Sequence, residues 1–202
     1  MASFLRPTVR LPHRLPAASI ESYRPHGVGG RERERERTMR STDLRRAARF
    51  NRWANRRLFD SCNGVSVTQW QATLPGAFGT LRDTLAHVAE VDLLWLARAG
   101  RRLPATVKAG EAIDRATLLE CRRAIDDALV QWTEVLGEDD LDQVLAYVDT
   151  EGVARETKLG LALAHMFDHQ TFHRGEASAM LASLGHEAPA LDMLDFFDED
   201  GG

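Results

Sequence analysis

The chain has 202 residues, 44% of them hydrophobic and 28% charged, which is typical of a globular protein with a sizeable core. No apolar run approaches the roughly 18 residues that cross a bilayer, so a membrane-spanning protein is not expected. The net charge is −4, and because residues 1–40 carry nine arginines against four glutamates, the remaining chain is strongly acidic, which disfavours nucleic acid as a partner.

Residues 1–40 are rich in proline, glycine and arginine and end in an alternating arginine and glutamate run. They show no apolar periodicity, so we predict a disordered extension over residues 1–40 and a folded domain over residues 41–202. An organelle transit peptide is an alternative, because the first twenty residues are basic and contain no acid. A start at Met39 is another alternative.

The apolar spacing becomes helical from Ser41 onward and predicts two long helices in the first half of the chain. The first has Ser41 or Thr42 as its N-cap and ends near Gly64. The second covers residues 81–100, with Gly100 as its C-terminal stop. The buried face expected for this second helix consists of Leu81, Leu85, Val88, Asp92 and Trp95.

Two further long helices are expected in the second half of the chain. The third runs from an N-cap at Asp114 to Gly137 and contains no histidine. After it, short alternating segments on either side of residues 149–152 predict a β-hairpin. The fourth helix, residues 158–185, is the longest.

The tail that follows the fourth helix is expected to pack on the helices through Leu191, Leu194 and Phe196 or Phe197. The predicted fold class is therefore all-α. We expect a four-helix bundle with a long crossover, containing the small β-hairpin, between the third and fourth helices.

The stretch HMFDHQTFHRGE, residues 165–176, places His165, His169 and His173 at steps of four. Four residues are just over one helical turn, so these imidazoles share a face, and two neighbours can bind one metal ion. The pair can be His165 with His169 or His169 with His173. A third ligand has to come from another helix, where His87 is the candidate. Alternatively, the histidines are ordinary hydrogen-bonded core residues without a metal.

Asp168 and Asp92 are candidate acceptors that would fix the orientation of an imidazole, or rarer oxygen ligands, and a solvated or capping role is equally open to them. The zinc-protease helix motif is absent, because Met166 and Gln170 stand where its glutamate would follow a histidine. The sequence also contains no phosphate-binding loop and no serine elbow, and its two cysteines stand apart from any histidine. The two cysteines, Cys62 and Cys121, also lie far from each other in sequence, which is typical of a protein with reduced thiols in the cytoplasm.

Four stretches of the chain carry a family resemblance: FNRWANRRL, GAFGTLRDTLAHVAEVDLLWLAR, HMFDHQTFHRGEASAML and PALDMLDFF. Together, over residues 44–197, they resemble the DinB-like (DinB/YfiT) family of metal-binding four-helix bundle proteins. The first is similar to the family's Tyr-Asn-x-Trp-Ala-Asn segment, with Phe50 in place of tyrosine. The third is close to the family's Asn-His-Gln-Thr-His-His-Arg-Gly-Gln motif and is the most specific of the four.

The resemblance implies a particular set of metal ligands. Carried across residue by residue, it makes His87, His169 and His173 the three ligands and leaves His165 as a neighbour beneath the site. Asp92 stands at the family's acidic position in the second helix.

The chain departs from the family's usual residues at three positions near this motif. Asp168 replaces a common asparagine and adds negative charge beside the metal, and Phe172 replaces a further histidine and makes the pocket more apolar. Glu176 replaces a common glutamine. None of these changes removes a ligand. Further candidate pocket residues are Asn51, Trp53, Asn55, Trp95 and Phe172, and a position in the apolar core is favoured over the pocket for the two tryptophans.

The resemblance implies a divalent metal, Zn, Ni or Fe, with a low-molecular-weight thiol as a possible co-substrate. The leading hypothesis is a metal-dependent hydrolase or thiol transferase with a three-histidine site open to a small thiol or water. The rivals are a non-catalytic, damage-inducible stress protein with a structural metal, and a helical interaction module without metal. The expected partners are a metal ion, a small-molecule substrate and a second copy in a homodimer.

Overall fold

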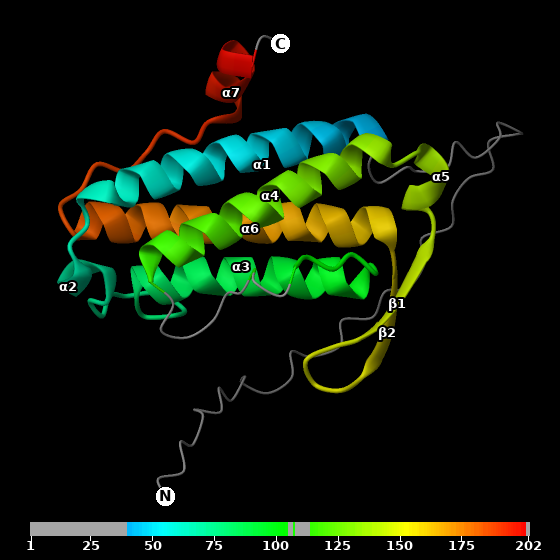
Figure 1. Ribbon diagram of the computed structural model, residues 1–202, viewed down its shortest axis with the longest axis horizontal. Coiled ribbons are helices and arrows are strands. Elements are labelled where there is room, and N and C mark those ends of the chain that lie inside the picture. Colours follow the sequence, from blue (N-terminus) through cyan, green and yellow to red (C-terminus); the bar gives the residue numbers. More distant parts are fainter. Residues whose placement is uncertain (1–39, 105–106, 108–113, 201–202) are drawn as a thin grey trace, which may run out of the picture. The chain divides into compact units, whose positions relative to one another are not determined.

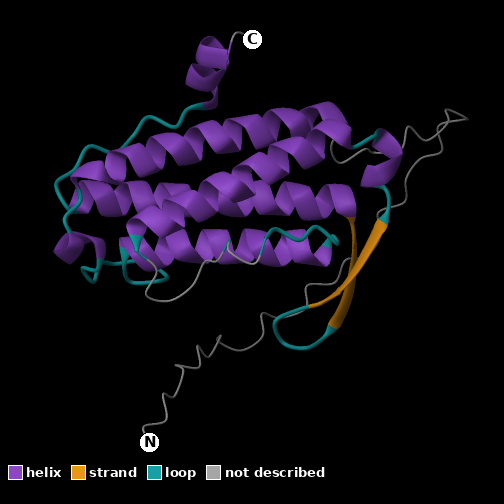
Figure 2. Ribbon diagram, in the orientation of Figure 1, coloured by secondary structure: helices purple, strands orange, loops and turns teal. Residues whose placement is uncertain are grey.

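The computed structural model describes residues 40–104, 107 and 114–200, so the predicted N-terminal extension lies outside the described residues apart from Arg40. Figure 1 labels the helices and strands, and Figure 2 distinguishes helix, strand and loop by colour. Within this part the elements in chain order are α1 (Ser41–Ser61), a 3-10 turn (Cys62–Gly64), α2 (Val67–Trp70), α3 (Leu81–Arg98), α4 (Arg115–Val135), α5 (Glu138–Leu141), β1 (Val144–Val148), β2 (Ala154–Lys158), α6 (Leu159–Ser183) and α7 (Met193–Asp200). No helix in these ranges is both long enough and apolar enough to cross a membrane.

Four long helices, α1, α3, α4 and α6, lie side by side in the folded domain (Figure 1). α1 packs against α4 and α6, and α3 packs against the same two helices. The prediction of a mostly helical fold with a small antiparallel sheet is confirmed. The two histidine-bearing helices, α3 and α6, are therefore neighbours.

The N-terminus of the first long helix is capped both from its own first turn, where Asp43 accepts the backbone N–H of Arg40 at 3.3 Å, and from another element. Ser41 or Thr42 was the predicted N-cap, but Arg40 is the N-cap and Ser41 already lies in α1. Glu138 of α5 accepts hydrogen bonds from the backbone N–H of Ser41 at 3.0 Å and from its hydroxyl at 2.8 Å. A distant carboxylate thus satisfies donors that a local cap would otherwise serve. In α4 the predicted cap is confirmed, because Asp114 accepts the N–H of Thr117 at 3.0 Å.

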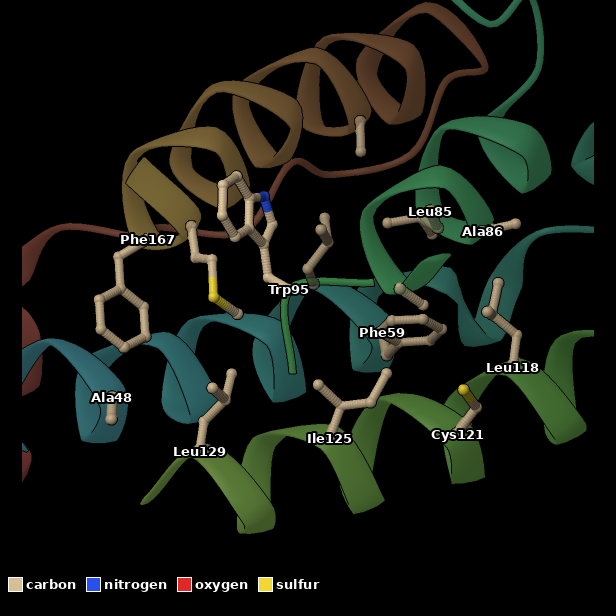
Figure 3. Close-up of a cluster of buried hydrophobic side chains, with 14 of the residues drawn as sticks. Ala48, Phe59, Leu85, Ala86, Trp95, Leu118, Cys121, Ile125, Leu129 and Phe167 are labelled. Carbon is tan, nitrogen blue, oxygen red and sulfur yellow. The ribbon is translucent and has the colours of Figure 1, made fainter. Parts of the chain in front are cut away.

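The apolar faces of the long helices meet in one core. Figure 3 shows Phe59 of α1 with Ile125 and Leu129 of α4 gathered between those two helices, and all three are nearly inaccessible to solvent. Burying one such side chain contributes about 1.5–3 kcal/mol. The face predicted for α3 is buried in full, including Leu85 and Trp95.

A set of hydrogen-bonded polar side chains crosses this apolar core. Asn55 of α1 donates to Asp126 of α4 at 3.0 Å and to Gln170 of α6 at 3.1 Å. Arg122 of α4 pairs with Asp126 and with Asp92 of α3. We call the set the buried polar network; its members are Asn51, Asn55, Asp92, Arg122, Asp126, Gln170 and Arg174. Because buried polar groups need partners, these contacts hold all four long helices in one register.

The hairpin between α4 and α6 has the predicted turn. β1 and β2 pair antiparallel with Val148 opposite Ala154, and the Asp149 carboxylate accepts the N–H groups of Glu151 and Val153 at 2.9 Å. The ring of Tyr147 on β1 packs against Trp95 of α3 with the ring centroids 5.1 Å apart. This contact anchors the hairpin to α3.

The tail packs on α1 through both candidate phenylalanines, and Phe196 is the more deeply buried of the two. Phe196 of α7 is 3% exposed and its ring contacts those of Phe50 and Trp53. Leu191 and Phe197 pack partly buried against the same cluster, as predicted. Leu194 was also expected to pack but is 70% exposed. It lies two residues from Phe196, so the two side chains point to different sides of a helix.

Candidate metal centre

Three imidazoles from two helices converge on one point. His87 comes from α3, and His169 and His173 come one turn apart from α6. The Nε2 atom of His169 lies 3.3 Å from Nε2 of His87 and 3.1 Å from Nε2 of His173. In a tetrahedral zinc site with bonds near 2.1 Å, two ligand nitrogens lie about 3.4 Å apart. The three histidines are therefore spaced to hold a metal ion.

The ring of His173 is oriented by a carboxylate. Its Nδ1 atom lies 2.9 Å from Oε2 of Glu176, one turn further along α6. An ionised carboxylate only accepts hydrogen bonds, so Nδ1 carries a proton, and in the neutral ring the lone pair lies on Nε2, which faces His169. A carboxylate behind the imidazole is the usual way to fix a ligand histidine.

The loop before α3, residues 75–80, forms one side of the site. The ring of Phe78 stacks on His87 with centroids 3.9 Å apart and an angle of 24°, and lies 5.5 Å from the ring of His173. The backbone N–H of Ala77 donates to Oε1 of Glu176 at 2.6 Å. One carboxylate therefore holds both a candidate ligand and the loop beside it.

The electrostatic surroundings favour the metal-binding form of these groups. Burial lowers the pKa of His87, and the neighbouring His173 lowers it further. Burial and the other histidines lower the pKa of His169 to about 4. Although burial raises it, the hydrogen bonds from Ala77 and His173 bring the pKa of Glu176 below its usual value. Near pH 7, His87 and His169 are thus neutral and Glu176 is ionised, as metal binding requires.

The other residues predicted near the site on α6 lie at its edge. The ring of His165 is 6.2 Å from that of His169 and packs against Trp95 at 5.6 Å, and it is not part of the converging group. Of the two possible pairs on α6, His169 with His173 is therefore the one that converges with His87. Phe172 is 69% exposed, with its ring 5.0 Å from that of His173, so it borders the site without enclosing it. Asp168 is exposed, and its charge opposes the lowering of the His169 pKa.

Asp92 and Asn51 were expected beside the metal, but the structure places both in the buried polar network. Asp92 follows His87 by five residues, which turns its side chain about 140° around the helix axis, toward Arg122 of α4. Asn51 donates to Gln170 and accepts from Arg174. Gln170 and Arg174 lie on α6, each one position after a histidine. They therefore face α1 instead of α3.

The sequence reasoning missed two residues that shape the site. Glu176 was noted only as a departure from a common glutamine, and Phe78 was not considered. The spacing of three between His173 and Glu176 on a helix was an available signal, because such pairs contact each other. No comparable signal existed for Phe78, since its contact with His87 depends on how the 75–80 loop folds.

The fold and the converging imidazoles define a helical protein with a candidate three-histidine metal centre. The sequence model of the DinB family matches residues 39–201. The chain belongs to the DinB family. It is also similar to the protein named Protein DinB of Bacillus subtilis (strain 168), with 22% identity over 149 residues, covering 71% of this chain and 87% of that protein.

Proposed function

We propose that this protein binds one divalent metal ion through His87, His169 and His173 and uses it as a metal-dependent hydrolase or thiol transferase. The observation that carries the proposal is the convergence of three Nε2 atoms with no further histidine, cysteine or carboxylate in the group within the described residues. Three protein ligands leave a coordination position for a water or a substrate atom.

The protein's own residues have distinct roles in this proposal. His87 and His169 supply neutral imidazole nitrogens, because burial keeps their pKa values low. Glu176 holds His173 in the tautomer that presents Nε2. Phe78 covers one face of His87 and limits the space beside the ligands. A divalent cation, Zn, Ni or Fe, would supply Lewis acidity toward a water or a small thiol.

A structural metal is the alternative function. The proposed ligands come from α3 and α6, so a bound cation would brace these helices against each other. In that case the fourth coordination position would be filled and unreactive. The spacing of the three histidines supports metal binding under either function, and only the reactivity of the remaining position distinguishes the two.

The first experiment tests metal binding itself. Native protein should contain about one divalent ion per chain by mass spectrometry, and His169→Ala should lose it, with affinity reduced beyond the 10–100-fold typical of outer-shell changes. His165→Ala is the matched control, because it removes an exposed imidazole one turn away on the same helix. If His169→Ala and His165→Ala retain metal equally, the three-histidine site is wrong.

The second experiment separates the two functions. A cobalt-substituted sample is titrated with 2-mercaptoethanol while its visible absorption is followed. An open position predicts a new sulfur-to-cobalt charge-transfer band that saturates with thiol. An unchanged spectrum in fully cobalt-loaded protein would favour the structural metal.

Several expectations from the sequence stay predictions. The contacts of each long helix with two others support a four-helix bundle, the architecture that we propose for the domain. A homodimer, a cytoplasmic location, a damage-inducible protein and a small-molecule substrate are the remaining ones. So are the disordered extension over residues 1–40 and the lack of a nucleic-acid partner.

A further inference from the structure

The carboxylate of Glu176 joins two elements that are far apart in sequence. Its Oε2 atom faces Nδ1 of His173 at 2.9 Å, and its Oε1 atom accepts the backbone N–H of Ala77 at 2.6 Å. Its two oxygens thus serve one donor from α6 and one from the 75–80 loop. The side chain is only partly buried, so these two hydrogen bonds fix its position more than packing does.

The loop approaches α6 so closely that little else fits between them. A Cβ atom on Gly76 would lie 2.5 Å from Cε of Met180 and 2.7 Å from Oε1 of Glu176. The loop is also closed on itself by a hydrogen bond of 2.7 Å from the N–H of Leu74 to the carbonyl of Gly79. This closed loop carries Phe78 onto the face of His87.

In the observed arrangement the two donors approach different oxygens of Glu176, so both atoms at the end of this side chain have to be acceptors. The backbone N–H of Ala77 is always a donor, and Nδ1 of His173 is a donor whenever Nε2 keeps its lone pair for a metal. A carboxylate accepts from both. A glutamine in the same side-chain conformation would carry NH₂ in place of one of these oxygens, so its NH₂ group would face one of the two N–H groups.

We propose that Glu176 is a positioning residue that couples the 75–80 loop to His173, so that the closed loop and the metal-binding tautomer occur together. This inference rests on the proposed function only in naming His173 a metal ligand. When both hydrogen bonds of Glu176 are intact, Phe78 stays stacked on His87 and the site is closed on the loop side. When the bond to Ala77 is broken, the 75–80 loop can move and carry Phe78 away from His87.

The test uses Glu176→Gln in the full chain, which keeps the size of the side chain and removes one acceptor. Glu120→Gln, at an exposed position on α4, is the control for the loss of one negative charge. Two quantities are measured by NMR in metal-free protein and with saturating Zn²⁺: hydrogen exchange of the Ala77 amide and the tautomer of His173 from its ring ¹⁵N shifts. A thermal unfolding transition like that of the native protein confirms that each variant is folded.

In metal-free Glu176→Gln we expect either the Nδ1–H tautomer of His173 or the protection of the Ala77 amide to be lost. With Zn²⁺ bound, His173 is forced into the Nδ1–H form, so the glutamine oxygen faces Nδ1 and the glutamine NH₂ group faces the Ala77 N–H. The Ala77 amide should then exchange about tenfold faster or more than in the native protein. The native protein and Glu120→Gln should keep both features in either state.

A Glu176→Gln protein that keeps both Ala77 protection and the Nδ1–H tautomer, with or without Zn²⁺, would overturn the coupling. Failure of the native protein to bind Zn²⁺ would instead contradict the proposed function. The metal-free comparison still tests the coupling in that case, so the two failures are distinguishable.

Discussion

At the scale of single residues, the three candidate ligands are held in different ways. His173 has a carboxylate behind it and His87 has a phenylalanine ring stacked on it. Nδ1 of His169 is buried and has no hydrogen-bond partner among the described residues, so the position of this ring depends on packing against its neighbours. His169 is therefore the ligand most sensitive to small shifts of α6.

The loop glycines give a prediction at this scale. Gly76→Ala should weaken Zn²⁺ binding about tenfold or more, because its Cβ would displace Met180 and Glu176, which positions His173. Gly79→Ala is the matched control. Gly79 has a φ of 75°, so alanine is strained there by about 1 kcal/mol, but no atom lies within 4 Å of the added carbon.

Zn²⁺ affinity of both variants is measured by competition with a chelating indicator, and stability by urea unfolding. We expect the two variants to lose similar amounts of stability. Only Gly76→Ala should also bind Zn²⁺ more weakly. Equal Zn²⁺ affinities for the two variants would mean that the close approach of the loop does not matter to the ligands.

At the scale of elements, α6 carries two sets of polar residues on different sides. His169 and His173 face α3, whereas Gln170 and Arg174, each one position later, join the buried polar network toward α1. A step of one residue turns a side chain by about 100° around a helix, which makes this division possible. A further set of α6 residues is apolar and fills the core, as with the fully buried Leu163, and other α6 residues such as Phe172 are exposed.

The C-terminal helix α7 is the element whose contribution is easiest to isolate. Phe196→Ala should destabilise the protein by about 3–5 kcal/mol, because it empties the position between Phe50 and Trp53. Leu194→Ala, in the same helix but 70% exposed, should change stability by less than about 0.5 kcal/mol. Urea unfolding of both variants measures the difference, and equal losses would contradict the packing of α7 on α1.

At the scale of the whole molecule, the buried polar network places ionisable groups where a core is otherwise apolar. Burial raises the pKa of Asp92 to about 6, although the charge of Arg122 beside it acts in the opposite direction. Burial raises the pKa of Asp126 as well, and it lowers that of Arg174 to about 10. The stability of the fold should therefore depend on pH through groups that are not candidate metal ligands.

Asp92 gives a pH prediction whose sign follows from this shift. Its pKa is near 6 when folded and about 3.8 when unfolded, so the folded state binds the proton more tightly. The stabilisation from this proton is fully present below pH 3.8 and is lost as the pH rises through 6. Between pH 7 and pH 4.5 the native protein should gain about 2 kcal/mol from this group.

Asp92→Asn cannot gain this proton, so the difference in unfolding free energy between native protein and variant should grow toward acid pH. The measurement is urea unfolding of metal-free protein at several pH values, and only the difference is interpreted because other groups titrate in both proteins. A difference that is constant from pH 7 to pH 4.5, or that shrinks, would show that Asp92 is not protonated in this range.

The sequence by itself determined the elements with strong local signals. Helical apolar spacing and the cap at Asp114 predicted the long helices, and the turn at residues 149–152 predicted the hairpin. The two short helices α2 and α5 were not predicted, because four residues are too few to show a period. The spacing of His169 and His173 made both candidate ligands visible, since they lie one turn apart on one helix.

Only the tertiary structure decided which side chains meet across elements. It brought His87 to the two α6 histidines, turned Asp92 away to Arg122, and set Phe78 and Ala77 against His87 and Glu176. Local periodicity reports which face of a helix is buried, but not the neighbour that the face will meet. That choice depends on how whole helices and loops pack, and no single segment of the sequence contains it.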